Sequence, residues 1–180
     1  GAVFGGLIFV EKSKRAVDLE DARLTMSGAP LNYVGVFQNH DIDFVASVAT
    51  SLGLKAVQLH GQEDQAYVNQ LKAELPTTVE IWKAYGVTDA KPELLVDHID
   101  RHLFDAQVGT QTGGTGQVFD WSLIGDPSQI MLAGGLSPEN AQQAATLGCL
   151  GLDLNSGVES APGKKDSQKL LAAFTAIRNY

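Results

Sequence analysis

The chain has 180 residues, of which 44% are hydrophobic and 19% charged, and these values suit one globular domain with a sizeable core. Its formal net charge of −8 argues against nucleic acid or an anionic membrane as a partner. No apolar run approaches the roughly 20 residues that span a bilayer, and no signal peptide is recognisable. The single cysteine, Cys149, excludes an intrachain disulfide and suits a reducing compartment, so we expect a cytoplasmic protein.

Short apolar runs alternate with amphipathic stretches along the whole chain. The runs predict strands at residues 4–10, 33–37, 56–59, 80–84, 102–105, 130–133 and 151–154. Between them, a 3.6-residue spacing predicts helices at 18–26, 42–52, 67–75, 138–147 and 166–178, with Asp41, Ser137 and Asp166 as N-caps. Seven strand–helix units without a break in composition indicate one parallel α/β domain over residues 1–180.

The position of the glycine-rich turns distinguishes two parallel α/β architectures. A doubly wound sheet usually carries its glycine-rich turn after the first strand. Here such turns follow the last three strands, as they do in phosphate-binding barrels. We therefore expect a (β/α)8 TIM barrel whose first strand–helix unit is missing from this sequence, and a natural chain that begins before Gly1.

Two of these turns are the segments Leu132-Ala-Gly-Gly-Leu136 and Gly151-Leu-Asp-Leu-Asn-Ser-Gly157. Each is a short apolar run that ends in glycines or small polar residues. Glycine lets backbone N–H groups approach an anion closely, and a helix N-terminus that follows adds partial positive charge. The pair of segments predicts a site for a phosphorylated small molecule.

Asp105 ends the fifth predicted strand, directly after Leu103-Phe104. A carboxyl group in an apolar, partly closed pocket is held in its acid form, which suits a general acid. The alternative is an aspartate that orders its own loop. The loop that follows contains Gly113-Gly-Thr-Gly116, including Gly114, which reads either as a lid or as a turn that faces phosphate.

Basic residues also lie at predicted strand ends. Arg15 could clamp a substrate carboxylate with its planar guanidinium, or belong to a solvated basic turn. His60 could touch substrate, although a lone histidine at a strand end is more often a structural, hydrogen-bonded residue. Lys83 is interpreted as the partner of a carboxylate rather than a catalytic amine.

The last predicted strand ends in Asp153, Asn155 and Ser156. Asp153 is expected to accept hydrogen bonds from sugar hydroxyls or to order the backbone, rather than to touch phosphate. Cys149 precedes this strand and therefore belongs to the opposite, stability face, where we expect a buried structural thiol. No histidine-rich metal site is expected at the strand ends.

In their order along essentially all 180 residues, several segments resemble phosphoribosylanthranilate isomerase of tryptophan biosynthesis. They are Gly6-Leu-Ile-Phe9 with Ser13-Lys-Arg15, Val34-Gly-Val-Phe37, Val57-Gln-Leu-His-Gly61, Leu103-Phe-Asp105, Gly113-Gly-Thr-Gly116 with Phe119-Asp-Trp121, Leu132–Leu136, Gly151–Glu159 and Pro162-Gly-Lys-Lys-Asp166. The segment Gln38-Asn-His-Asp41 is similar to the isomerase half of bifunctional enzymes fused to indole-3-glycerol-phosphate synthase, which implies that fusion partner.

The resemblance implies an Amadori rearrangement of N-(5-phosphoribosyl)anthranilate to 1-(2-carboxyphenylamino)-1-deoxyribulose 5-phosphate, without metal or organic cofactor. The family's general acid maps to Asp105, and its anthranilate-binding arginine maps to Arg15. Its phosphate site maps to the backbone around Gly134-Gly135 and Asn155–Gly157, with Asp153 beside it.

Two departures from the family pattern stand out. The family has Ser-Pro-Arg where this chain has Ser13-Lys14-Arg15, and this loss of proline frees one backbone dihedral. The family's general base is a cysteine in a Cys-Gly pair after the first strand, and no such pair occurs in these 180 residues. We therefore expect little or no turnover from this polypeptide alone. The alternative is a non-catalytic sugar-phosphate-binding or scaffold barrel that lacks its base.

Overall fold

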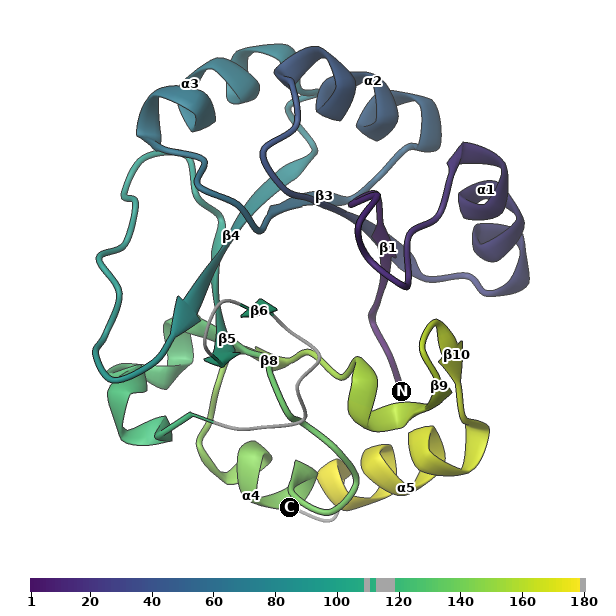
Figure 1. Ribbon diagram of the computed structural model, residues 1–180, viewed down its shortest axis with the longest axis vertical. Coiled ribbons are helices and arrows are strands. Elements are labelled where there is room, and N and C mark those ends of the chain that lie inside the picture. Colours follow the sequence, from purple (N-terminus) through teal and green to yellow (C-terminus); the bar gives the residue numbers. More distant parts are fainter. Residues whose placement is uncertain (109–110, 113–118, 179–180) are drawn as a thin grey trace. The chain divides into compact units, whose positions relative to one another are not determined.

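Parallel strands joined by helices form the fold, which the computed structural model describes for residues 1–108, 111–112 and 119–178 (Figure 1). The chain divides into two units. Gly1–Ala84 and Leu94–Arg101 form the first, and Tyr85–Glu93 and His102–Tyr180 form the second. In the described part of the chain, no helix has the length and apolar character needed to cross a membrane.

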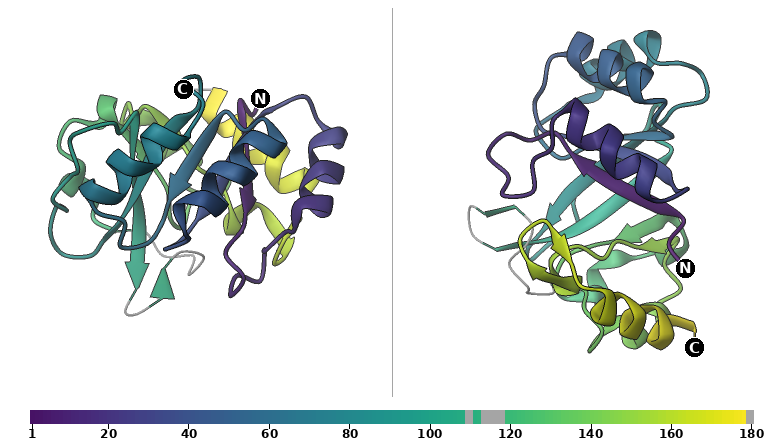
Figure 2. Two further views of the ribbon diagram at one scale, coloured as in Figure 1. Left: turned by 90° about the horizontal axis from the view of Figure 1, so that it is seen from above. Right: turned by 90° about the vertical axis from the view of Figure 1, so that its right-hand side faces the viewer.

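The first unit is built from consecutive strand–helix pairs. In chain order these are β1 (Phe4–Ile8), α1 (Leu19–Gly28), β2 (Asn32–Phe37), α2 (Ile42–Leu52), β3 (Ala56–Leu59), α3 (Gln65–Glu74) and the start of β4 (Glu80–Val87). The four strands pair in that order, all parallel. Helices α1 to α3 lie in a row along one side of these strands (Figure 2). Because parallel strands keep one direction, the loops after β1, β2 and β3 gather at one edge of the sheet.

The second unit contains β5 (Arg101–Val108), β6 (Gln111–Thr112), β7 (Ile130–Leu132), α4 (Ala141–Thr146), β8 (Gly151–Leu152), β9 (Glu159–Ala161), β10 (Lys164–Lys165) and α5 (Ser167–Arg178), with 3-10 turns η1 (Trp121–Ile124), η2 (Pro127–Gln129) and η3 (Ser156–Val158). Strand β7 lies between β5 and β8, parallel to both. Helices α4 and α5 pack together over a small core of Ala141, Val158 and Ala173.

The structure confirms the parallel α/β class, all seven predicted strands and a helix at each of the five predicted places, but it corrects the expected seven complete strand–helix units. No α-helix is found between β4 and β5, and the described residues between β5 and β7 contain the short strand β6 and 3-10 turns but no α-helix. The predicted helix at 138–147 shortens to Ala141–Thr146, with Asn140 rather than Ser137 as N-cap. Asn140 makes no side-chain cap bond; its side chain accepts from the Ser137 N–H and donates to the Gly135 carbonyl in the turn before the helix.

Two further sequence predictions concern helix N-caps. Asp166 accepts hydrogen bonds from the backbone of Gln168 and Lys169, as a cap should. Asp41 precedes α2 but makes no side-chain cap bond. The hairpin β9–β10 was not predicted, although Pro162-Gly163 between its strands is an ordinary turn dipeptide.

Candidate active site

Asp105 lies at the carboxyl end of the β5–β7 pairing in the second unit. The parallel pairing ends at Phe104↔Leu132, and Asp105 is the next residue of β5, which runs three residues further than predicted. Gly134 comes so close that a Cβ there would lie 2.6 Å from Asp105 Oδ1 and would also collide with the Ala106 backbone. Gly134 also has a φ of +83°, so only glycine fits beside this carboxyl group.

The surroundings of Asp105 favour its protonated form. The pKa of Asp105 is raised to about 7, chiefly by burial and secondly by the negative charge of Asp153, while the Ala106 N–H acts in the opposite direction. No described residue donates a hydrogen bond to Asp105 Oδ1, although this atom is buried. A buried carboxyl group with an unused oxygen and a pKa near neutrality can donate a proton to a bound molecule.

The turn after β7 lies against the loop after β8. Gly134 and Gly135 both have positive φ angles, of 83° and 65°. A Cβ at Gly157 would collide with the Leu136 carbonyl and lie 2.8 Å from Ser137 Cβ, so the two loops touch at backbone distance. The sequence-predicted phosphate residues Gly134, Gly135, Asn155, Ser156 and Gly157 are therefore brought together within the second unit.

Lys165 organises the loop after β8. Its Nζ donates to the Asn155 carbonyl at 2.9 Å, to Asn155 Oδ1 at 2.7 Å and to Glu159 Oε1 at 3.0 Å. Asp153 lies on β8's continuation, where its N–H donates to the Leu132 carbonyl at 2.8 Å. Burial raises the pKa of Asp153, and the Lys165 charge partly offsets that effect.

Arg15 and His60 belong to the first unit, each in a loop that follows a strand. Arg15 lies in a turn after β1, where its N–H donates to Ser13 Oγ at 3.1 Å. The turn is also held by the Val17 N–H, which donates to the Ile8 carbonyl at 2.9 Å. This bond from Val17 to Ile8 holds the loop against β1, even though position 14 is a lysine and not the proline of the pattern described above.

His60 directly follows β3, and its ring is held by the strand itself. The ring Nε2 lies 2.8 Å from Gln58 Oε1, and the backbone N–H of His60 donates to the Phe37 carbonyl at 2.8 Å. The pKa of His60 is lowered to about 4, chiefly by burial and secondly by the Lys83 charge, while the Glu63 charge acts in the opposite direction. The ring is therefore neutral at pH 7.

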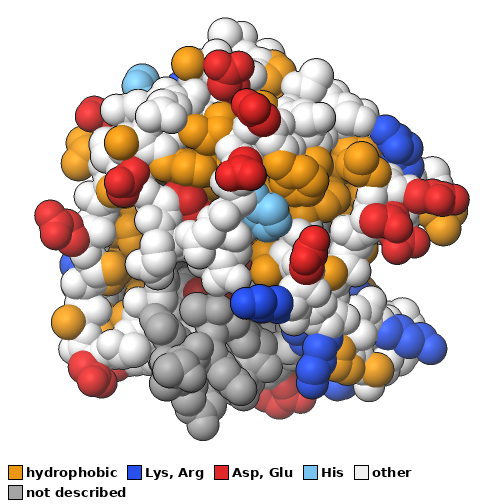
Figure 3. Space-filling model, turned by 45° about the horizontal axis from the view of Figure 1, so that its top comes forward, with side chains coloured by type: hydrophobic (Ala, Val, Ile, Leu, Met, Phe, Trp, Pro, Cys, Tyr) orange, Lys and Arg blue, Asp and Glu red, His pale blue; other side chains and the backbone are white. Residues whose placement is uncertain are grey.

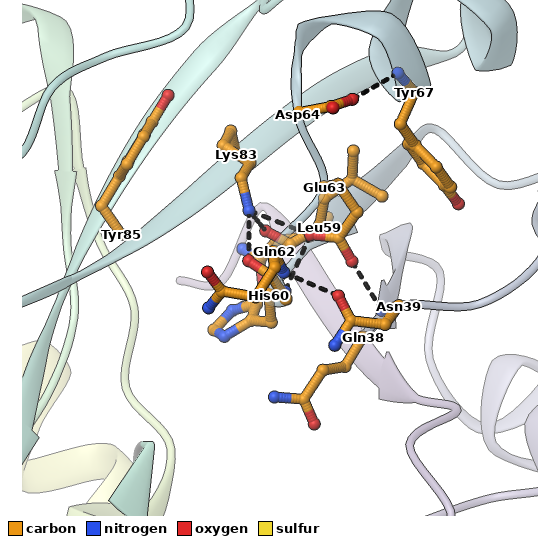
Figure 4. Close-up of polar contacts among 12 residues, drawn as sticks. Gln38, Asn39, Leu59, His60, Gln62, Glu63, Asp64, Tyr67, Lys83 and Tyr85 are labelled. Atoms are coloured by element: carbon orange, nitrogen blue, oxygen red, sulfur yellow. Dashed lines mark hydrogen bonds and ion pairs between the residues drawn. The ribbon is translucent and has the colours of Figure 1, made fainter. Parts of the chain in front are cut away.

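Lys83 pairs with Glu63, which confirms that it is the partner of a carboxylate (Figure 4). The Nζ–Oε2 distance is 2.9 Å, and both side chains are almost inaccessible. Sequence reasoning missed Glu63, since nothing in the polar run Gln62-Glu63-Asp64 shows which residue turns inward.

The sequence analysis also named Gly114 and Cys149. Gly114 lies outside the described residues. Cys149 precedes β8, as predicted, but is half-buried rather than buried, and burial raises the pKa of its thiol. Within the described ranges, no group of three or more His, Cys, Asp or Glu side chains is arranged to hold a metal ion. Acidic side chains are spread over the face shown in Figure 3.

Comparison with known proteins places these features in a family. The family description "N-(5'phosphoribosyl)anthranilate (PRA) isomerase" matches residues 1–176. The chain is 88% identical over 180 residues to the tryptophan biosynthesis protein TrpCF of Vibrio parahaemolyticus, and it spans 37% of that relative's length.

Solved structures agree with this match. Phosphoribosyl anthranilate isomerase from Thermus thermophilus superposes with a TM-score of 0.85 at 27% identity, over 99% of this chain and 89% of that one. An isomerase in complex with reduced 1-(o-carboxyphenylamino)-1-deoxyribulose 5-phosphate superposes with a TM-score of 0.80 at 29% identity, over 100% of this chain and 89% of that one. The chain therefore belongs to the N-(5'phosphoribosyl)anthranilate isomerase family.

Proposed function

We propose that this domain carries out the Amadori rearrangement of N-(5-phosphoribosyl)anthranilate in tryptophan biosynthesis. The observation that carries the proposal is the buried Oδ1 of Asp105, which has no hydrogen-bond partner among the described residues and lies beside Gly134. A carboxyl group whose pKa is raised to about 7 can be protonated when the substrate binds. No redox partner is required, because the reaction only moves protons and a double bond within one molecule.

In the first step, Asp105 donates its proton to the furanose ring oxygen. The C1–O bond breaks, and the nitrogen lone pair forms the C1=N bond of an open-chain iminium. A base then removes the C2 proton, and the electrons form an enolamine that tautomerises to the 2-ketose. Asp105 is regenerated as the acid by taking up a proton from solvent.

The remaining substrate groups are allotted to the other predicted residues. The phosphate is held by backbone N–H groups of the turns at Gly134-Gly135 and Asn155–Gly157, which Lys165 orders through Asn155. Arg15 receives the anthranilate carboxylate, and Asp153 accepts from sugar hydroxyls. Cytoplasmic location and fusion to indole-3-glycerol-phosphate synthase remain part of the proposal.

We further propose that a strand–helix unit additional to these 180 residues completes a (β/α)8 barrel and carries the general base. Among the described residues, β1 pairs only with β2 and β8 only with β7. The 180-residue polypeptide alone should then turn over little or no substrate.

The test compares Asp105→Asn and Arg15→Ala with the parent in the full-length protein. Asp105→Asn should abolish turnover and leave binding of the reduced product analogue within a few-fold. Arg15→Ala should raise KM about tenfold, as expected for one lost charged hydrogen-bond pair, and leave inhibition by inorganic phosphate unchanged. A parent protein that binds the analogue but turns over no substrate would instead support the non-catalytic sugar-phosphate barrel.

A further inference from the structure

The buried pair Glu63–Lys83 joins the loops that follow β2 and β3 to strand β4. Glu63 Oε1 accepts from the Asn39 N–H at 2.7 Å, and its Oε2 accepts from the Gly61 N–H at 2.8 Å and from Lys83 Nζ at 2.9 Å. Asn39 follows β2, Gly61 and Glu63 follow β3, and Lys83 lies on β4. Figure 4 shows the Lys83 amino group pointing into this cluster.

The environment of Glu63 keeps its carboxylate ionised. Burial alone would raise its pKa, but the Lys83 charge and the hydrogen bonds from backbone N–H groups outweigh burial and hold the pKa of Glu63 below its ordinary value. A buried ion pair contributes little net stability compared with well-packed apolar residues. A pair with this many bonds is therefore better explained by the geometry it imposes than by the stability it adds.

That geometry is imposed on His60. Lys83 Nζ also donates to the Gly61 carbonyl at 2.8 Å and to the Leu59 carbonyl at 3.4 Å, so the carbonyl groups of the residues before and after His60 bond to the same ammonium group. The ring is oriented separately by Gln58, which is 3% exposed. Because the Gln58 oxygen can only accept, Nε2 of His60 carries the hydrogen and Nδ1 is left as an acceptor.

Nothing in the described part of the chain donates to this Nδ1, and His60 is only partly buried, so a ligand can reach the residue. The charged groups that act on the ring are Lys83 from β4 and Glu63 from the loop after β3. Because burial and the positive charge of Lys83 oppose protonation of the ring, the imidazole does not bind an anion as a cation would; it is a neutral hydrogen-bond acceptor at neutral pH.

We propose that Glu63 and Lys83 are positioning residues that present His60 Nδ1 as a neutral acceptor for a hydroxyl or N–H donor of the substrate. The proposal rests on the proposed function for the identity of that substrate. It gives His60 a role different from that of Arg15: Arg15 recognises negative charge, and His60 recognises a donor.

The test uses the full-length protein labelled with ¹⁵N-histidine, with the His60 resonance identified by its loss in His60→Gln. In the parent protein at pH 7 the two ring nitrogens should report a neutral ring with hydrogen on Nε2. A charged ring, or hydrogen on Nδ1, would overturn the proposal without any variant of the ion pair.

The double variant E63Q/K83M then removes both charges together. His60 should lose its single tautomer, and its pKa should move closer to the ordinary value for histidine. KM should rise about tenfold, the effect of one ordinary hydrogen bond, with kcat within about twofold. The matched control is Lys55→Met, because Lys55 forms a lysine–glutamate pair with Glu80 at the other end of β3 and β4, 3.6 Å apart and 43% and 22% exposed. This control should change neither readout.

The outcomes separate the two proposals. A folded E63Q/K83M with unchanged His60 resonances and unchanged KM would refute the positioning role while leaving the isomerase function standing. A parent protein without turnover would refute the function, while the tautomer measurement would still decide the positioning role. If E63Q/K83M fails to fold, the resonances of the parent protein decide alone.

Discussion

The two units each contain a lysine–glutamate pair behind their strand-end loops, and the pairs differ in what surrounds them. Lys83–Glu63 in the first unit is 2.9 Å long with side chains 5% and 1% exposed, whereas Lys165–Glu159 in the second is 3.0 Å long with side chains 42% and 4% exposed. The first unit thus encloses both charges and bonds them fully. The second unit keeps its lysine in contact with water.

The same contrast holds for the groups that can exchange protons. Glu63 receives three hydrogen bonds in the first unit, while Asp105 in the second has a buried oxygen with no partner among the described residues. A buried charge with all its bonds made holds loops in place, and a buried carboxyl group with an unmet bond is available for chemistry. The comparison predicts that loss of the Lys83–Glu63 pair in the first unit acts mainly on structure and binding, and that loss of Asp105 in the second acts mainly on turnover.

The largest effect is expected from Asp105→Asn. Removal of a general acid typically costs about 10²–10⁴ in rate, because the amide cannot protonate the ring oxygen. We expect kcat to fall by that factor in the full-length protein, measured by disappearance of substrate fluorescence. Asp105→Glu serves as the control that retains an acid. If Asp105→Asn instead weakens phosphate binding as much as turnover, Asp105 is a structural residue and the contrast between the units fails.

Of the two lysine substitutions, Lys83→Met and Lys165→Met, Lys83→Met should lower the free energy of unfolding more. It leaves Glu63 buried without its counter-charge, a situation that typically costs about 3 kcal/mol or more. Urea unfolding of the full-length protein would show a lower midpoint with an unchanged slope. Glu63→Gln combined with Lys83→Met should recover part of the loss, since no buried charge then remains. A Lys83→Met protein as stable as the parent would contradict the inferred role of the pair.

The pH dependence of stability should have opposite signs in the two units. Asp105 has its pKa raised from 3.8 to about 7, so the folded protein keeps a proton that the unfolded chain releases, and this group reduces stability as pH rises through that window. His60 has its pKa lowered from 6.5 to about 4, so its contribution is present above pH 6.5 and is lost as pH falls towards 4.

Asp105→Asn should therefore raise the free energy of unfolding at pH 8 by on the order of 2 kcal/mol and have little effect below pH 4. His60→Gln should show the reverse, with its relative gain at pH 4. Denaturant titrations at the two pH values measure both. Equal effects at the two pH values in either variant would show that the group does not titrate as its surroundings indicate.

The smallest effect is expected from Lys165→Met, because the Lys165 ammonium group is partly solvated. The loss of its ion pair with Glu159, in which only the lysine is exposed, and of its bonds to Asn155 should cost about 1 kcal/mol of stability. KM should rise a few-fold through loosening of the phosphate loop, with kcat nearly unchanged. Steady-state kinetics beside urea unfolding would check both values. A cost as large as that of Lys83→Met would remove the difference between the two pairs.

Much of the fold follows from local pattern. The seven strands were predictable because buried parallel strands are continuous apolar runs, such as Ala56–Leu59, which matches the structure at both ends. The expectation of seven complete strand–helix units was wrong, since it extended the alternating order to the segments between β4 and β5 and between β5 and β7, for which no amphipathic stripe was identified. Boundaries also moved where pairing beyond the local run decides them, as in β5, which continues to Val108 to pair with β6.

The sequence predicted more of the candidate site residues in the second unit than in the first. The sequence by itself determined that Asp105 and the two glycine turns stand at strand ends, because the end of an apolar run marks where a parallel strand opens onto its loop. Only the tertiary structure decided that Glu63, not Asp64, turns inward to meet Lys83, and that Asp105 Oδ1 has no partner among the described residues. These facts depend on the distances between residues from different strands and on their exclusion from water, and neither is encoded in the spacing of residues along one strand.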